Sequence, residues 1–289
     1  MAMKQNPKII SMKKIVLKSF CLVLLISVFS CQLVLAQKQA ITIAGSTTIM
    51  PLSEKWAKTF KNKTGINVNV HGGGSTGGIN AAKIGTADIG ASSRELNENE
   101  KTELKPIVIG KDALVIIVNK SNIVGDISLD QARGIFIRRI KNWNELGGPN
   151  KPIQIINRES GSGTRGLFEE VIMQIMLKDK TRKIVPMSLD SIVNNSNAEV
   201  KESVKLIPNS IGYVSVGYID NSVKVLNVDS IAPTQNNITS GKYRLIRNLY
   251  YLVKDDRDEK IKSFLGYVLS KEGQSLIMQE GFLSVLSLK

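Results

Sequence analysis

Apolar and polar residues alternate near the start of the chain in a pattern typical of a strand, a helix and a second strand. Residues 40–44 alternate and are rich in β-branched side chains, which predicts a strand. Leu52, Trp56 and Phe60 recur every four residues and predict one apolar face of a helix. Alternation returns in residues 66–70, where a second strand is expected.

This order of elements continues along the chain. Further strands are expected over residues 87–94, 107–110, 113–118, 153–156 and 211–218, and further helices over residues 79–84, 167–176 and 261–277. The runs 107–110 and 113–118 are almost entirely apolar, which is typical of strands buried on both faces of a sheet. The alternation predicts an α/β fold with a largely parallel sheet, and such sheets bind ligands beyond the carboxyl ends of their strands.

Three predicted strands run into loops of glycine, serine and threonine that open a helix, at residues 45–48, 72–78 and 160–165. The first amide groups of a helix lack intrahelical partners and carry the positive end of the helix dipole, and small residues let an anion approach them. Each loop alone is equally typical of a tight turn or a helix cap. Three loops in the same topological position predict a cage for a compact oxyanion.

The first 36 residues have the composition of a secretory signal peptide. Five lysines and no acidic residue precede or flank the apolar run 21–29, and cleavage is expected after Ala36. Two alternatives are a lipoprotein signal that leaves Cys31 acylated and a retained membrane anchor. Loss of this segment lowers the formal charge from +14 to +9. The predicted location is periplasmic or extracellular, with a lipid anchor if Cys31 is acylated.

The content of cysteine, histidine and aromatic residues excludes several classes of site. Cys21 and Cys31 both lie in the predicted signal peptide, and His71 is the single histidine. Transition-metal sites and Cys/His catalytic sites need clusters of these side chains, so neither is expected. The chain is basic, but aromatic residues are only 5% and do not interleave with a basic run, which argues against a nucleic-acid partner.

Residues 73–77 match the G-x-S-x-G pattern of a hydrolase nucleophile elbow, with Ser75 as the serine. That mechanism needs a histidine base, which follows the serine in the chain order of that fold. His71 lies four residues before Ser75 on a predicted strand end, where an exposed or hydrogen-bonded strand residue is the simpler interpretation. The match is interpreted as accidental, and a secreted serine hydrolase is kept as an alternative.

Arg158 and Arg165 flank the third loop. The planar guanidinium fork suits tetrahedral oxyanions, although many arginines only pair with a surface carboxylate. Arg158 ends the predicted strand at the edge where the loop lies, so a ligand role is favoured for it. Arg165 lies inside the helix start and can face solvent instead, and Glu159 can orient either arginine.

These loops belong to a longer series of segments that resembles the phosphate-binding proteins of bacterial phosphate ABC transporters, a family of type II periplasmic binding proteins. In chain order the segments are residues 44–48 with Pro51 and Trp56, 74–78, 87–94, 158–165, 211–214 and 269–274. The resemblance extends over nearly all of the chain after residue 36.

The resemblance implies two α/β lobes, each a mostly parallel sheet flanked by helices, that close on one phosphate in the cleft between them. Lobe 1 would comprise residues 37–115 and 244–289, and lobe 2 residues 116–243. It further implies a monomeric binding protein, not an enzyme, that uses no cofactor and no metal and delivers phosphate to a membrane permease with an ATPase. Carried over by position, the ligand-binding residues are Thr47, Thr48, Ser75, Ser93, Arg158, Ser162, Gly163 and Thr164.

Ser93 departs from the family pattern. Some members carry an aspartate there, which accepts the proton that phosphate has and sulfate lacks. A serine hydroxyl can accept or donate, so it excludes a fully deprotonated oxyanion less strictly. Asp88, the nearby acid, lies within a predicted strand. The alternatives are the same fold binding sulfate, molybdate or tungstate, and a phosphate-sensing surface or adhesion protein without a transport partner.

Overall fold

The computed structural model describes residues 40–254 and 258–288. The predicted signal peptide, residues 1–36, lies outside the described residues. Residues 41–289 form one compact unit. Across the described ranges, no helix has both the length and the apolar character needed to span a bilayer.

The N-terminal part alternates strands and helices in the predicted order. Its elements are β1 (Ile41–Gly45), α2 (Met50–Thr64), β2 (Val68–His71), α3 (Gly74–Ile84), β3 (Ile89–Ser92) and α4 (Glu98–Glu103). Strands β2, β1 and β3 are adjacent and parallel, so their carboxyl ends lie along one edge of the sheet. The prediction for α3 was wrong at its start. The helix begins at Gly74 rather than at residue 79, because glycines at positive φ turn the chain directly into the first helical turn.

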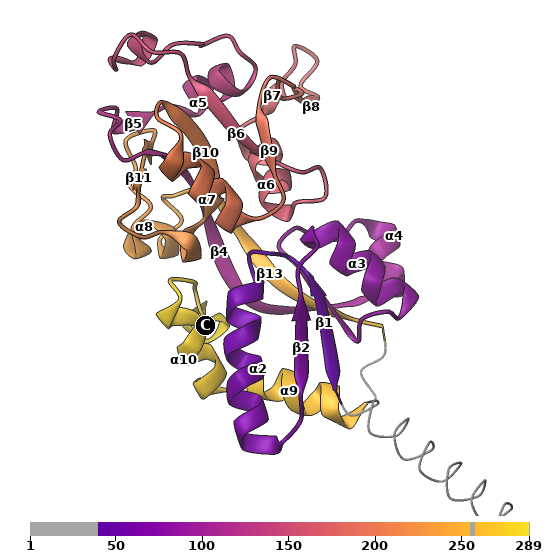
Figure 1. Cartoon of the computed structure of the whole chain (residues 1–289). Coiled ribbons are helices and arrows are strands. Elements are labelled where there is room, and N and C mark those ends of the chain that lie inside the picture. Colours follow the sequence, from indigo (N-terminus) through magenta and orange to yellow (C-terminus); the bar gives the residue numbers. More distant parts are fainter. Residues whose placement is uncertain (1–39, 255–257, 289) are drawn as a thin grey trace, which may run out of the picture. The chain divides into compact units, whose positions relative to one another are not determined.

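Two long strands, β4 (Lys105–Asn119) and β13 (Ile246–Val253), run antiparallel through the middle of the sheet. In Figure 1 they pass from the elements around β1 and α2 to those around β6 and β10. The apolar runs 107–110 and 113–118 are therefore one strand rather than two, with Asp112 at the join. The pairing makes the sheet mixed, where a largely parallel one was expected.

The remaining elements follow between β4 and β13 and after β13. They are β5 (Asp126–Ile127), α5 (Leu129–Phe136), η1 (Trp143–Leu146), β6 (Gln154–Arg158), α6 (Gly163–Val171), β7 (Gln174–Met176), β8 (Arg182–Ile184), β9 (Ile192–Asn194), α7 (Asn197–Leu206), β10 (Ser210–Ser215), η2 (Val216–Tyr218), β11 (Val223–Val225), β12 (Asn227–Val228), α8 (Gln235–Thr239), α9 (Glu259–Leu269), α10 (Lys271–Gln279) and η3 (Val285–Leu288). The main sheet has the order β2-β1-β3-β13-β4-β10-β6-β9, with β11 paired to β4.

The helical stripe predicted over residues 167–176 is too long. Helix α6 ends at Val171, and β7 (Gln174–Met176) pairs with β8 (Arg182–Ile184) in an antiparallel hairpin. Ile175 and Met176 continue the helical spacing by chance, and pairing with β8 satisfies their backbone groups instead.

Two large apolar cores pack against the sheet. One joins α2 and α9 to β1, with Phe60 and Phe264 edge to face at 5.2 Å between ring centroids. The other joins α5, α6 and β10, where Phe168 and Tyr213 stack at 4.2 Å. Strand β4 contributes to both cores: Ile109 packs in the first, and Ala113 packs in the second. The lobe boundaries at residues 115/116 and 243/244 stay a prediction.

Candidate functional site

The first loop leaves the carboxyl end of β1 and places Thr47 and Thr48 in the interior. Gly45 has φ +136, and a Cβ there would lie 2.2 Å from the Ala91 carbonyl oxygen, so only glycine lets the loop pass β3 this closely. The Ser46 hydroxyl donates to Ser93 Oγ at 2.9 Å and accepts from the Thr48 amide at 3.2 Å. Thr47 and Thr48 are both buried.

The second loop is the first turn of α3, and it presents Ser75 to the segment after β3. Ser75 Oγ accepts from the Ser93 amide at 3.0 Å and lies 3.3 Å from Ser93 Oγ. His71 is exposed on β2, and among the described residues no hydrogen bond joins it to Ser75. The geometry pairs Ser75 with another serine instead of a catalytic base.

The third loop joins β6 to α6 and lies directly against the second. Ser162 caps α6, accepting from the Arg165 amide at 3.2 Å. A Cβ on Gly163 would lie 2.4 Å from Ser75 Oγ and 2.6 Å from Ser93 Oγ. Thr164 Oγ1 is 3.1 Å from Thr48 Oγ1. The N-terminus of α6 thus meets residues of the first two loops, and only glycine at position 163 allows the approach.

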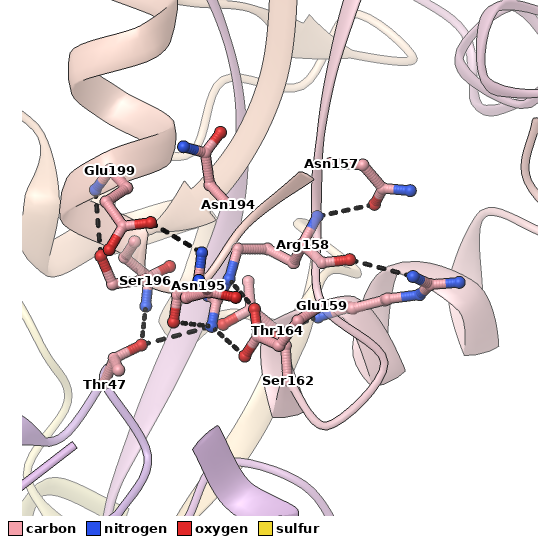
Figure 2. Close-up of polar contacts among 12 residues, drawn as sticks. Thr47, Asn157, Arg158, Glu159, Ser162, Thr164, Asn194, Asn195, Ser196 and Glu199 are labelled. Carbon is pink, nitrogen blue, oxygen red and sulfur yellow. Dashed lines mark hydrogen bonds and ion pairs between the residues drawn. The ribbon is translucent and has the colours of Figure 1, made fainter. Parts of the chain in front are cut away.

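Arg158 ends β6 with its side chain 1% exposed. Figure 2 shows its guanidinium between Glu159, Thr47 and Asn195. Nε and Nη2 donate to the two Glu159 oxygens at 2.8 Å each, and Nη2 also reaches Thr47 Oγ1 at 3.3 Å. Nη1 is buried and has no partner among the described residues. An unpaired buried guanidinium nitrogen costs free energy unless a ligand accepts from it.

Arg165 has a supporting position. Its Nη1 donates to the Arg158 carbonyl at 2.9 Å, and its Nε pairs with Glu169 at 2.8 Å one helical turn away. The Arg158 side chain therefore faces the loops, and Arg165 holds the backbone carbonyl of Arg158 in place. Asp88 accepts from the Thr42 amide near the start of β1, at the end opposite to the loops, and is not positioned to act in place of Ser93.

Two charged residues that the sequence interpretation missed complete the polar cluster. Asp112 on β4 and Arg247 on β13 are register partners, and both are buried. Asp112 Oδ2 accepts from Arg247 Nε at 3.0 Å and Nη2 at 2.6 Å, and Oδ1 accepts from Ser215 at 2.7 Å. Burial raises the pKa of Asp112, and Arg247 opposes that rise. The available signal was an acidic residue between the two apolar runs of β4 and the one charged residue of β13.

Arg247 also reaches the predicted site residues. Its Nη2 donates to Thr48 Oγ1 and Thr164 Oγ1, each at 3.0 Å, while its Nη1 is buried without a partner among the described residues. Asn197, also missed, donates to Thr48 Oγ1 at 3.0 Å. The Tyr218 hydroxyl donates to the Thr47 carbonyl at 2.5 Å, and burial raises the pKa of this tyrosine.

The structure thus brings the eight predicted residues together from four segments. Hydroxyls, helix N-termini and two guanidinium groups dominate the cluster, and each guanidinium has its own carboxylate partner, Glu159 or Asp112. Such a donor-rich, charge-balanced cluster can hold an oxyanion by hydrogen bonds. No group of three or more potential metal ligands of the His, Cys, Asp or Glu type occurs in the part of the chain that is described.

Sequence comparisons point to one family. Residues 35–272 match the model of a family described as the PBP superfamily domain. The phosphate-binding protein PstS of Borreliella burgdorferi is 32% identical over 256 residues, which cover 86% of this chain and 91% of that protein. The phosphate-binding protein PstS of Bacillus subtilis is 30% identical over 256 residues, covering 86% of this chain and 82% of that protein.

Solved structures agree with the sequence comparison. A crystal structure from Clostridium perfringens, described as a phosphate ABC transporter substrate-binding protein with bound phosphate, matches with a TM-score of 0.78 at 33% identity. It covers 85% of this chain and 99% of that chain. An ABC-type phosphate transport receptor from Vibrio cholerae matches with a TM-score of 0.68 at 33% identity, covering 84% and 99%.

Proposed function

The chain belongs to the PBP superfamily, and from this membership we propose that it is an extracytoplasmic solute-binding protein that captures inorganic phosphate for an ABC transporter. It is a binding protein and not an enzyme. The observation that carries the proposal is the Arg158 guanidinium, which is buried, bonded to the Thr47 hydroxyl of the distant first loop, and left with Nη1 unpaired among the described residues. A tetrahedral oxyanion is the ligand that this arrangement suits.

Capture in this proposal joins donors from the two sides of the site. Thr47, Thr48, Ser75 and Ser93 would contribute hydroxyl and amide donors from one side, and Arg158, Ser162, Gly163 and Thr164 from the other. The two sides belong to the proposed lobes, residues 37–115 with 244–289 and residues 116–243, which close by a hinge motion. Because Glu159 already neutralises Arg158, directional hydrogen bonds rather than net charge supply most of the affinity.

Selectivity depends on Ser93 in this proposal. Ser93 Oγ accepts from Ser46 and shares a hydrogen bond with Ser75 Oγ, so it keeps its own proton when Ser75 donates and a lone pair when Ser93 donates. The hydroxyl can therefore accept from a protonated phosphate or donate to a fully deprotonated anion. This observation favours the same fold binding sulfate or molybdate as the second candidate function.

The proposed cellular setting follows from the N-terminal sequence. Residues 1–36 act as an export signal, with acylation of Cys31 as the alternative that leaves a lipid anchor. The monomer would then deliver phosphate to a permease and ATPase complex in the membrane.

Titration calorimetry of phosphate into the protein tests this function. Wild type binds phosphate, and Arg158→Lys raises Kd by at least about tenfold, because an ammonium cannot reproduce the buried fork. Arg138→Lys is the matched control, since Arg138 is a partly buried arginine that donates to the Ile153 and Asp190 carbonyls instead of to the loops. If wild type shows no binding of phosphate but binds sulfate tightly, the choice of ligand is overturned.

A further inference from the structure

Arg247 is fixed by an ion pair that uses only part of its guanidinium. Asp112 occupies the edge formed by Nε and Nη2, and Ser215 holds the other oxygen of that carboxylate. The remaining edge, formed by Nη1 and Nη2, is directed at Thr48 and Thr164, because the two hydroxyls share the N–H of Nη2 that Asp112 does not occupy. Nη1 is buried and has no partner among the described residues.

The hydrogen bonds around Thr48 determine the direction of its own proton. Asn197 Oδ1 accepts from the Ser215 amide at 3.1 Å, so the other end of the Asn197 side chain must be its NH₂ group. Thr48 Oγ1 therefore accepts from both Asn197 Nδ2 and Arg247 Nη2. A hydroxyl oxygen has two acceptor sites, so the Thr48 proton is donated to Thr164 Oγ1, 3.1 Å away.

The acceptor sites of the Thr164 hydroxyl oxygen can be counted in the same way. Its hydroxyl oxygen accepts from Thr48 and from Arg247 Nη2, which fills both acceptor sites. Its proton must point away from these partners. A chain of fixed donors thus runs from Arg247 and Asn197 through Thr48 to Thr164.

We propose that Arg247 is a second guanidinium of the oxyanion site, which donates to the bound anion through Nη1 and, through Thr48, sets the Thr164 hydroxyl as a donor to it. This inference rests on the proposed function and deepens it. Asp112 is a positioning residue, because it holds the fork at the angle that leaves Nη1 free. The position that faces the Thr164 hydroxyl accepts only an anion oxygen that carries no proton, so a protonated phosphate oxygen lies toward Ser93.

Calorimetry on the full chain tests the contact. Arg247→Lys keeps a cation beside Asp112 and removes the fork, and we expect phosphate Kd to rise about tenfold to a hundredfold. The melting temperature without ligand should fall as well, because the fork's bonds to Asp112, Thr48 and Thr164 are lost. Arg138→Lys, the matched control, leaves Kd within about twofold of wild type. The double variant Arg247→Lys with Thr164→Val should lose less than the product of the two single effects, because the second donor acts partly through the first.

A second measurement leaves Arg247 itself unchanged. In protein labelled with ¹⁵N-arginine, phosphate should shift the side-chain resonances of two arginines, Arg158 and Arg247. The shift of the Arg247 resonance should still occur in Arg158→Lys. Unchanged Kd in Arg247→Lys, or a response from one arginine only, would overturn the role of Arg247 and leave the proposed function standing. Wild type that shows no phosphate response in either measurement would overturn both.

Discussion

At the scale of single residues, ion pairs outside the site differ sharply in their surroundings. Arg94 donates to both oxygens of Glu100 at 2.9 Å, and the Glu100 side chain is only 12% exposed. The Arg94 guanidinium lowers the pKa of Glu100 below its ordinary value of 4.5. By contrast, the Glu98–Lys101 pair on the same helix is mostly exposed and is expected to stabilise the fold little.

Glu100→Gln tests this difference. Because the folded pKa is lowered, the carboxylate stabilises the fold above pH 4.5, and the contribution disappears as the pH falls through the folded value. Urea unfolding at pH 7 should show a loss of about 1 kcal/mol, and the gap to wild type should close at acid pH, below the lowered folded pKa of Glu100. Glu98→Gln, the control, should change little at either pH. A loss of equal size at both pH values would contradict the assignment.

At the scale of elements, helix α3 lies unusually close to the sheet. A Cβ on Gly78 would lie 2.5 Å from the Ala44 carbonyl oxygen and 2.7 Å from that of Ala91. Gly77, its neighbour in the same helix, has nothing within 4 Å of its Cβ position. The close approach at Gly78 holds Ser75, one turn earlier, beside Ser93.

Substitution of these two glycines should have opposite effects. Gly78→Ala pushes α3 away from β1 and β3 and should destabilise the protein by about 1–3 kcal/mol, with weaker phosphate binding because Ser75 moves. Gly77→Ala should be neutral or stabilising by up to about 1 kcal/mol, since alanine favours the helix. Denaturant unfolding and calorimetry measure both effects. Equal stability in the two variants would show that α3 does not depend on this contact.

At the scale of the whole molecule, hydrogen bonds cross between segments that the proposed boundaries assign to different lobes. Tyr218 donates to the Thr47 carbonyl at 2.5 Å, and the Thr76 amide donates to the Gly161 carbonyl at 3.2 Å. These contacts lie beside the candidate site. In the proposed two-lobe arrangement these bonds belong to the closed form, and the anion would add further hydrogen bonds across the same boundary.

Phosphate should therefore compact and stabilise the molecule. Small-angle X-ray scattering should record a smaller radius of gyration with phosphate, and saturation at a hundred times Kd should add about 2.7 kcal/mol to the unfolding free energy. Tyr218→Phe removes one crossing bond and should weaken phosphate binding about fivefold. Tyr250→Phe, which loses a bond to Glu95 outside the site, is the control. An unchanged radius would argue against closure by hinge motion.

Local order along the chain is what the sequence by itself determined. Gly45 and Ser162 stand where strands run into helices, because glycine permits the turn and Ser162 caps α6, and Ser75 lies in the first turn of α3. The parallel arrangement of β2, β1 and β3 follows from the same alternation of strands and helices. Arg158 was predictable for a similar reason, since it ends a strand beside one of these loops.

Only the tertiary structure decided which distant residues complete the cluster. Asp112 and Arg247 are 135 positions apart, and Asn197 is 149 positions from Thr48. No periodicity encodes such pairs, because register between β4 and β13 arises from the packing of the whole sheet. The merging of two apolar runs into β4, and the end of α6 at Val171, have the same origin. Spacing along the chain sets local conformation, whereas the partners of a buried charge depend on strands brought together by the fold.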